Sequence, residues 1–147
     1  KELIENIIEK NKNGFLKSMD VILRYPEGTN ALYINADVSG MISIVTNLLE
    51  NASKYSEVGS EIKIDLAEEN NSIVLSVSDA GEGIPDEEKE NIFMKFYRIG
   101  NENTRKKKGT GLGLFIVKNL VLLHNGAIEV KNNSPKGTIF ALQFPKN

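Results

Sequence analysis

The sequence predicts a single α/β domain in which helices pack on a β-sheet. Segments such as Glu61–Leu66 alternate strictly between polar and apolar residues, as half-buried strands do. The segment from Asp37 to Ser56 instead carries apolar residues at the spacing of an amphipathic helix. A chain of 147 residues suits one compact domain and is too short for two ordinary ones.

The composition excludes several classes of function. A net charge of −2, from 18 basic and 20 acidic residues, gives no global attraction to nucleic acid or anionic membrane. The absence of cysteine excludes disulfides and thiolate zinc sites and fits a reducing compartment. No apolar run approaches the roughly 18 to 20 residues that span a bilayer. We therefore expect a cytoplasmic location, with no nucleic-acid partner and no direct membrane contact.

The N-terminal segment predicts a short helix followed by two strands. Residues 1–10 carry a narrow apolar stripe, which either packs on its own domain or marks residues 1–12 as the C-terminal end of a preceding helical module. In the second case the domain proper comprises residues 13–147. Phe15–Tyr25 predicts the first strand and Ala31–Ile34 a short second one. The stripe consists of Leu3, Ile4, Ile7 and Ile8.

Polar residues follow one side of the helix that begins at Asp37. Asn47, Asn51 and Lys54 recur at about one-turn spacing, so two amides and an ammonium share that side. Taken alone, the two asparagines fit a solvated helix edge, because asparagine gains little inside a helix. They also fit a site for a metal ion and a phosphate chain.

The strand Ser72–Ser78 ends in the sequence Asp79-Ala80-Gly81-Glu82-Gly83. A carboxylate at a strand end, followed by two glycines, lies beside backbone that can approach a ligand closely. The alternative is a turn in which the aspartate bonds its own backbone.

The next segment combines a short helix, aromatic residues and a basic loop. Asp86–Ile92 predicts a helix capped by Asp86, and Phe93–Arg98 joins three aromatic residues to basic ones. Gly100–Lys108 is polar and unpatterned and ends in four consecutive positive charges, so we expect a mobile loop.

Three glycines precede the most apolar helix. Gly109–Leu114 reads Gly-Thr-Gly-Leu-Gly-Leu before the helix Phe115–Leu123, where free N–H groups at a helix start form a phosphate cradle. The segment lacks the Gly-Lys-Ser/Thr ending of a Walker A loop and the third glycine of the dinucleotide fingerprint. We expect four residues of this helix to be buried, namely Ile116, Val117, Leu120 and Val121.

His124, the only histidine, closes this helix. It could be a phosphoacceptor, but a helix C-cap is expected, where a cation interacts favourably with the helix dipole. Ala127–Lys131 and Gly137–Phe144 predict the two final strands.

Four strings together resemble the ATP-binding boxes of the sensor histidine kinases, within the GHKL group that includes gyrase B and the ninety-kilodalton heat-shock chaperone. The N box reads Asn-Leu-Leu-Glu-Asn-Ala-Ser-Lys-Tyr-Ser at 47–56, and the G1, F and G2 boxes match 79–83, 93–98 and 109–114. They occur in the family's order, and the resemblance covers roughly Tyr33 to Phe144.

The resemblance implies a two-layer α/β sandwich, with a mixed, mostly antiparallel sheet covered on one face by three helices and a mobile lid over ATP. It implies binding of Mg-ATP and transfer of the γ-phosphoryl group to a histidine on a dimerisation module of the same parent protein, upstream of a response regulator. The parent would be anchored in the bacterial inner membrane. The chain alone is expected to be a monomer that does not phosphorylate itself. The alternatives are a regulatory module that senses ATP without transfer and a GHKL ATPase.

The resemblance also implies roles for individual residues. Asn51 would bind Mg²⁺, with Asn47 as a second ligand, and Lys54 would hold phosphate oxygens. Tyr55 would stack by the adenine, and the Asp79 carboxylate would accept a hydrogen bond from its amino group. Arg98 and the lid lysines would offset charge in the transition state. The further ATP-binding residues implied are Gly81, Gly83, Ile84, Lys108, Gly109, Thr110, Gly111, Leu112, Gly113, Leu114 and Thr138.

One position departs from the hydrolytic relatives. Those proteins carry a glutamate where this chain has Asn47, and that carboxylate activates water. Because an amide cannot act as this base, we expect negligible ATP hydrolysis.

Overall fold

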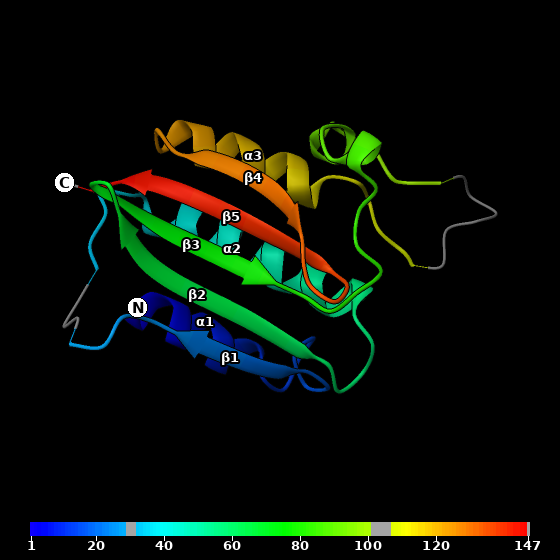
Figure 1. Ribbon diagram of the computed structural model, residues 1–147, viewed down its shortest axis with the longest axis horizontal. Coiled ribbons are helices and arrows are strands. Elements are labelled where there is room, and N and C mark those ends of the chain that lie inside the picture. The colour runs from blue at the N-terminus through cyan, green and yellow to red at the C-terminus, as the bar shows by residue number, and fades with distance from the viewer. Residues whose placement is uncertain (29–31, 101–106, 147) are drawn as a thin grey trace.

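In the described part of the chain, a five-stranded sheet carries three α-helices on one face (Figure 1). The computed structural model describes residues 1–28, 32–100 and 107–146. No helix in these ranges is both long and apolar enough to cross a membrane. The helices are α1 (Glu2–Asn11), α2 (Val38–Tyr55) and α3 (Gly113–Leu123), with 3₁₀ turns η1 (Asp86–Glu88) and η2 (Asn91–Phe93). The strands are β1 (Asp20–Arg24), β2 (Glu61–Glu69), β3 (Ser72–Ser78), β4 (Ala127–Asn132) and β5 (Thr138–Pro145).

The sheet is mixed and mostly antiparallel, as expected. Its strand order is β1-β2-β3-β5-β4, and β1 and β2 form the parallel pair. The central strand β3 pairs with β2 on one side and β5 on the other. The β3–β5 register ends with Ser78 opposite Ile139, so Asp79 leaves β3 beside the start of β5.

The core lies between the helical layer and the sheet. Helix α2 supplies its centre, because Ile44, Val45, Leu48 and Leu49 are fully buried there. The helix begins where Asp37 accepts a hydrogen bond from the Gly40 N–H at 2.6 Å, a regular N-cap. Helices α2 and α3 run in opposite directions, so the C-terminal end of α2 lies at the same end of the domain as the start of α3 (Figure 1).

The apolar stripe of the first helix packs on this domain. Helix α1 lies against α2 and buries Ile4 and Ile7 to 6% and 3% exposure. The assignment of residues 1–12 to a preceding module stays a prediction.

Two strand predictions in the N-terminal region were wrong. The strand predicted at Phe15–Tyr25 begins only at Asp20, because its partner β2 begins at Glu61, opposite that residue. The preceding residues form turns that bury Leu16. Residues 32–34 of the predicted second strand form no strand, and Ala31 lies outside the described residues. The final strands were predicted to within about a residue.

The predictions for two helical segments also need correction. The segment Asp86–Ile92 forms two 3₁₀ turns, and Asp86 pairs with Lys89 at 2.5 Å instead of capping a helix. In α3, Val117 and Val121 are fully buried as expected, but Ile116 is 38% exposed. Leu120 is only partly buried. Residues four apart share one face, so the α3 surface that meets the core is narrower than its apolar composition predicts.

Candidate functional site

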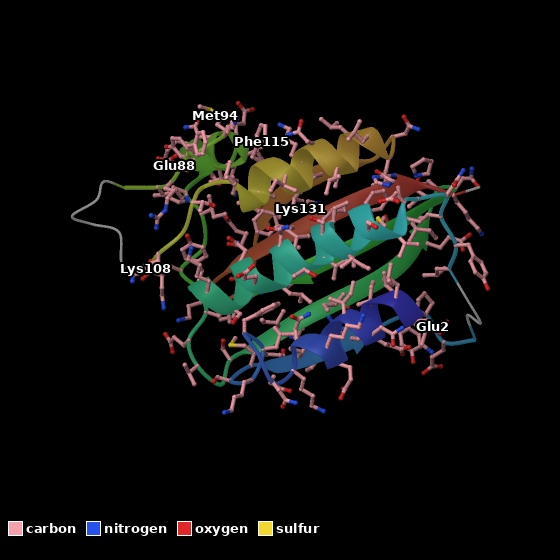
Figure 2. All side chains as sticks on the ribbon, turned by 180° about the vertical axis from the view of Figure 1, so that it is seen from behind. Glu2, Glu88, Met94, Lys108, Phe115 and Lys131 are labelled. Carbon is pink, nitrogen blue, oxygen red and sulfur yellow. The ribbon has the colours of Figure 1, made fainter. Side chains whose placement is uncertain are left out.

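The last turns of α2 lie between two glycine-rich segments. On one side, the Tyr55 carbonyl oxygen is so close to Gly81 that a Cβ there would lie 2.5 Å away. On the other, the Lys54 ammonium would collide with any Cβ at Gly109. Figure 2 shows Lys108 on the segment that approaches this end of α2. The structure therefore brings together the N, G1 and G2 boxes that lie far apart in the sequence.

The Asp79 carboxylate is buried and held by backbone. Its exposure is 4%, and its Oδ1 accepts hydrogen bonds from the N–H groups of Gly81 at 2.8 Å and Thr138 at 3.2 Å. Burial raises the pKa of Asp79, and these two hydrogen bonds oppose the shift. No described residue donates to the other oxygen, Oδ2. The aspartate thus bonds its own turn, as one reading of the sequence expects, and keeps one oxygen for a ligand.

Gly81 and Gly137 permit this arrangement. A Cβ at Gly81 would lie 3.0 Å from Asp79 Oδ1. Gly137 has a φ of +111°, and a Cβ there would collide with the Asp79 carbonyl oxygen. The same carbonyl accepts from the Asn133 amide at 2.8 Å, a contact that no sequence pattern predicts.

Positive charges gather on the other side of α2. Burial lowers the pKa of Lys54, and the neighbouring Arg98 guanidinium lowers it further, with Lys107 adding to the effect and Glu50 opposing it. Arg98 also donates to the Lys107 carbonyl oxygen. A partly buried cation beside other cations is a site where a polyanion is favourable.

The Asn47 side chain has a fixed orientation. Its Nδ2 donates to the Ser43 carbonyl at 2.8 Å, so its Oδ1 faces Gly113, where a Cβ would lie 3.0 Å away. No described residue bonds the half-buried Asn51 side chain. The described residues hold no cluster of three or more histidine or acidic side chains suited to a metal. Amide oxygens are nevertheless the hard, neutral ligands that Mg²⁺ accepts, so the donor set fits this ion.

The G2 segment is tied to the F box. The Phe96 N–H donates to the Gly111 carbonyl at 3.0 Å, and a Cβ at Gly111 would lie 2.7 Å from the Phe96 carbonyl carbon. The Tyr97 hydroxyl in turn donates to Glu88 at 2.5 Å. No side chain caps the N-terminus of α3 through its N-cap residue Leu112. The first N–H groups of α3 therefore keep the capacity to bind an anion.

The remaining predicted residues lie around the Asp79 carboxylate and the Lys54 cation cluster, or outside the described residues. Lys108, Gly109 and Thr110 are exposed, and the Thr110 hydroxyl accepts from the Leu112 N–H at 3.4 Å. Ile84 and Leu114 pack against the core, so their side chains support the site. Most of the loop predicted at Gly100–Lys108 lies outside the described residues.

His124 lies at the opposite end of α2 from this site. It is the C-cap residue of α3, as predicted. Its Nε2 accepts from the Asp37 N–H at 3.0 Å, and its Nδ1 lies 2.7 Å from the Leu120 carbonyl. His124 thus joins the C-terminal end of α3 to the N-cap residue of α2. The 18-residue helix separates it from the site by about 27 Å.

The structure has a mixed sheet under three helices and a buried carboxylate with one oxygen that no described residue bonds. It also has a cationic cluster beside a helix N-terminus without a side-chain cap. Together these features define a nucleotide-binding ATPase domain. A family model agrees. The model described as histidine kinase-, DNA gyrase B- and HSP90-like ATPase matches residues 36–147, and the chain belongs to that family.

Relatives within the family are sensor kinases. The chain is 42% identical over 110 residues to the sensor protein SrrB of Staphylococcus aureus, a match that covers 75% of this chain and 19% of that protein. It is also similar to the mycobacterial sensor histidine kinase MprB, with 29% identity, a TM-score of 0.83 and coverage of 98% and 92% of the two chains. The catalytic domain of histidine kinase ThkA gives 28% identity and a TM-score of 0.84 over 99% and 92%. The sandwich architecture and the recognition of the family are thereby confirmed.

Proposed function

We propose that this chain binds Mg-ATP and transfers the γ-phosphoryl group to a histidine on a dimerisation module of the same parent protein, which then supplies a response regulator. One observation carries the proposal. The last turn of α2 separates a carboxylate with one available oxygen from a cluster of cations in which Arg98 and Lys107 lower the pKa of Lys54. An adenine base and a triphosphate are the ligand that satisfies both.

Asp79 is proposed to select the base. Its Oδ2 can accept from the adenine 6-amino group, whereas the carbonyl oxygen of guanine at that position would meet a carboxylate. Tyr55 follows Lys54 on the same turn, and because the residue is 46% exposed it is open to stacking.

The proposed triphosphate site is the region of Lys54, Arg98, Lys108 and the first N–H groups of α3. Asn51, with Asn47, would hold the Mg²⁺ ion, which neutralises phosphate charge. In the transfer step an imidazole nitrogen bonds to the γ-phosphorus as the bond to the β,γ-bridging oxygen breaks and ADP leaves. Arg98 and the lysines offset the charge on the departing group.

Asn47 favours this reaction over hydrolysis. The orientation of its amide brings a neutral oxygen, and not a general base, toward the start of α3. A histidine nucleophile needs little activation at neutral pH, whereas water needs a base.

The test supplies a separate histidine-bearing helical module and γ-labelled ATP to the purified chain. We expect label on the module, and none when Asn51→Ala replaces the wild type. Saturable ATP binding without any transfer would favour the regulatory alternative, and steady ATP turnover by the isolated chain would favour the ATPase. The sedimentation mass in the same buffer is expected to be that of the 16.3 kDa monomer.

A further inference from the structure

A side-chain hydrogen bond joins the F box to the first 3₁₀ turn. The Tyr97 hydroxyl donates to Glu88 Oε2 at 2.5 Å, and the Asn91 amide reaches the same oxygen at the longer distance of 3.5 Å. Glu88 and Tyr97 are both half-buried, and the pKa of Tyr97 is raised chiefly because its hydroxyl donates to Glu88. Hydrogen bonds to a carboxylate are stronger than those between neutral groups, so this bond can hold the F box in place.

The residue before Tyr97 has a strained backbone. Phe96 has a φ of +62°, a left-handed conformation that bulky side chains rarely adopt. Such strain persists only where neighbouring contacts hold the chain in one conformation. The Phe96 side chain lies largely in solvent, since the residue is 64% exposed. The contacts on either side of Phe96 therefore hold it.

Contacts from two segments hold this part of the F box. The Phe96 N–H donates to the Gly111 carbonyl oxygen at 3.0 Å. Gly111, at φ +73°, approaches so closely that a Cβ there would lie 2.7 Å from the Phe96 carbonyl carbon and 2.8 Å from the Tyr97 carbonyl oxygen. From the other segment, Glu88 holds the Tyr97 side chain. The path of the chain through the F box is thus set by the G2 segment and by Glu88 together.

The path of the chain at Tyr97 determines where the next residue, Arg98, lies. The Arg98 guanidinium belongs to the cation cluster, since it lowers the pKa of Lys54, and it donates to the Lys107 carbonyl oxygen. Its Nε would lie 3.9 Å from a Cβ at Gly109. A shift of the backbone at Tyr97 would therefore move this guanidinium relative to the proposed triphosphate site.

We propose that Glu88 and Tyr97 are positioning residues for phosphoryl transfer, and that their hydrogen bond fixes the F box so that the Arg98 guanidinium meets the charge on the departing group. This inference rests on the proposed function and deepens it. Neither residue needs to touch ATP, because both act through Arg98. When the bond is lost, Arg98 keeps its charge near the triphosphate, so the rate of transfer falls more than the affinity for ATP.

The experiment compares the wild type with Glu88→Ala, Tyr97→Phe, Arg98→Ala and the double variant Glu88→Ala/Arg98→Ala. Single-turnover transfer from saturating γ-labelled ATP to the separate histidine-bearing module gives the rate, calorimetry the ATP affinity and thermal unfolding the stability. Glu88→Gln, which keeps an acceptor oxygen, is the conservative variant. Asp86→Ala is the matched control, because Asp86 is an acidic residue of the same 3₁₀ turn that pairs instead with Lys89 at 2.5 Å.

Glu88→Ala and Tyr97→Phe should each slow transfer about tenfold, the low end for a hydrogen bond to a charged group, and change ATP affinity less than about twofold. Glu88→Gln should recover most of the rate, because an amide oxygen still accepts from the hydroxyl. Adding Glu88→Ala to Arg98→Ala should cause no further loss, since the effect acts through Arg98. Asp86→Ala should transfer at the wild-type rate.

Wild-type rates in both Glu88→Ala and Tyr97→Phe, or a loss in Glu88→Ala that multiplies with that of Arg98→Ala, overturn this inference and leave the proposed function standing. Equal losses of rate and ATP affinity, together with lower thermal stability, do the same, because the pair would then only support the fold. Absence of any transfer by the wild type overturns both.

Discussion

The proposed nucleotide site has a base half, formed by Asp79 and Thr138, and a phosphate half, formed by Lys54, Arg98, Lys108 and Gly109. The two halves are built in different ways. The base half is part of the sheet, since Asp79 and Thr138 extend adjacent strands, share two backbone-directed hydrogen bonds and are each 4% exposed. The phosphate half rests on loop residues such as Lys108 and Gly109, which are exposed. The base half is therefore held in place by hydrogen bonds of the sheet, whereas the phosphate half places like charges near one another on exposed segments.

This structural difference suggests separate functions for the two halves. In the proposed function, the buried Asp79 carboxylate would provide specificity, because its fixed partners leave it little freedom to accept a wrong base. The cations would provide affinity that depends on charge and salt, because a bound polyanion relieves their mutual repulsion. The predictions below test the two halves separately.

Gly137→Ala should have the largest effect on the base half. The new Cβ meets the Asp79 carbonyl, and a residue at φ +111° is strained, so we expect a loss of about 3 kcal/mol in unfolding free energy. The matched control is Gly59→Ala, at φ +82° with open space around the new Cβ, which should cost only about 1 kcal/mol. Equal losses in urea unfolding would show that the close approach to Asp79 is unimportant.

Asp79→Asn should keep the fold and lose the base. The asparagine oxygen can still accept from Gly81 and Thr138, but its NH₂ group then faces the adenine amino group. We expect ATP affinity to fall roughly 10- to 100-fold, the value of a hydrogen bond to a charged group. Asp65→Asn, at an exposed residue paired with Arg24, is the control and should bind ATP normally. Calorimetry with ATP and GTP measures both affinity and selectivity.

The raised pKa of Asp79 gives the base half a pH signature. Because the folded-state pKa lies above the ordinary 3.8, ionisation costs stability as pH rises from 3.8 through that folded value, and acidification removes the cost. ATP binding needs the ionised form and should weaken as pH falls through the same raised pKa. Asp79→Asn should lack both trends. Parallel stability curves for the two proteins between pH 3 and pH 7 would contradict this.

Lys54→Met should affect only the phosphate half. It removes a cation whose pKa is lowered by burial and by Arg98, so ligand-free stability should not fall. ATP affinity should drop about tenfold, and its dependence on salt should become weaker. Lys63→Met, at a residue paired with Glu61 on the sheet, is the control. A tenfold loss of affinity for adenosine in the Lys54 variant would contradict the division into halves.

His124→Ala should have the smallest effect on function. It removes the bond to the Asp37 N–H and should lower the unfolding free energy by about 1 kcal/mol. Nucleotide affinity and phosphotransfer should remain at wild-type levels, because His124 lies at the far end of α2. If γ-labelled ATP labels the chain itself and this variant loses that label, His124 would be a phosphoacceptor.

Local sequence patterns predicted the elements whose ends depend on their own residues better than the strands whose ends depend on a pairing partner. Helix α2 begins directly after its N-cap residue Asp37, as expected, because an N-cap and an apolar stripe are properties of the segment itself. The strand predicted at Phe15–Tyr25 was too long because its length depends on where β2 begins. Residues 32–34 have strand-like composition but no strand to pair with.

The site residues show the same limit. Their types and spacing singled out Asp79 and the glycines, which lie together in the fold, because residue type and spacing are visible in the sequence. The Asn133 contact and the bond from Tyr97 to Glu88 could not be foreseen, because they depend on which residues meet in the fold. The contact of His124 with the Asp37 N–H likewise joins residues that are 87 positions apart in the sequence.

The most direct test of the central claim is a calorimetric titration with a non-hydrolysable ATP analogue, with and without Mg²⁺, beside a GTP analogue. We predict saturable binding that selects adenine in either condition and tightens with Mg²⁺. Equal affinity for the two analogues, or no binding at all, would contradict the account.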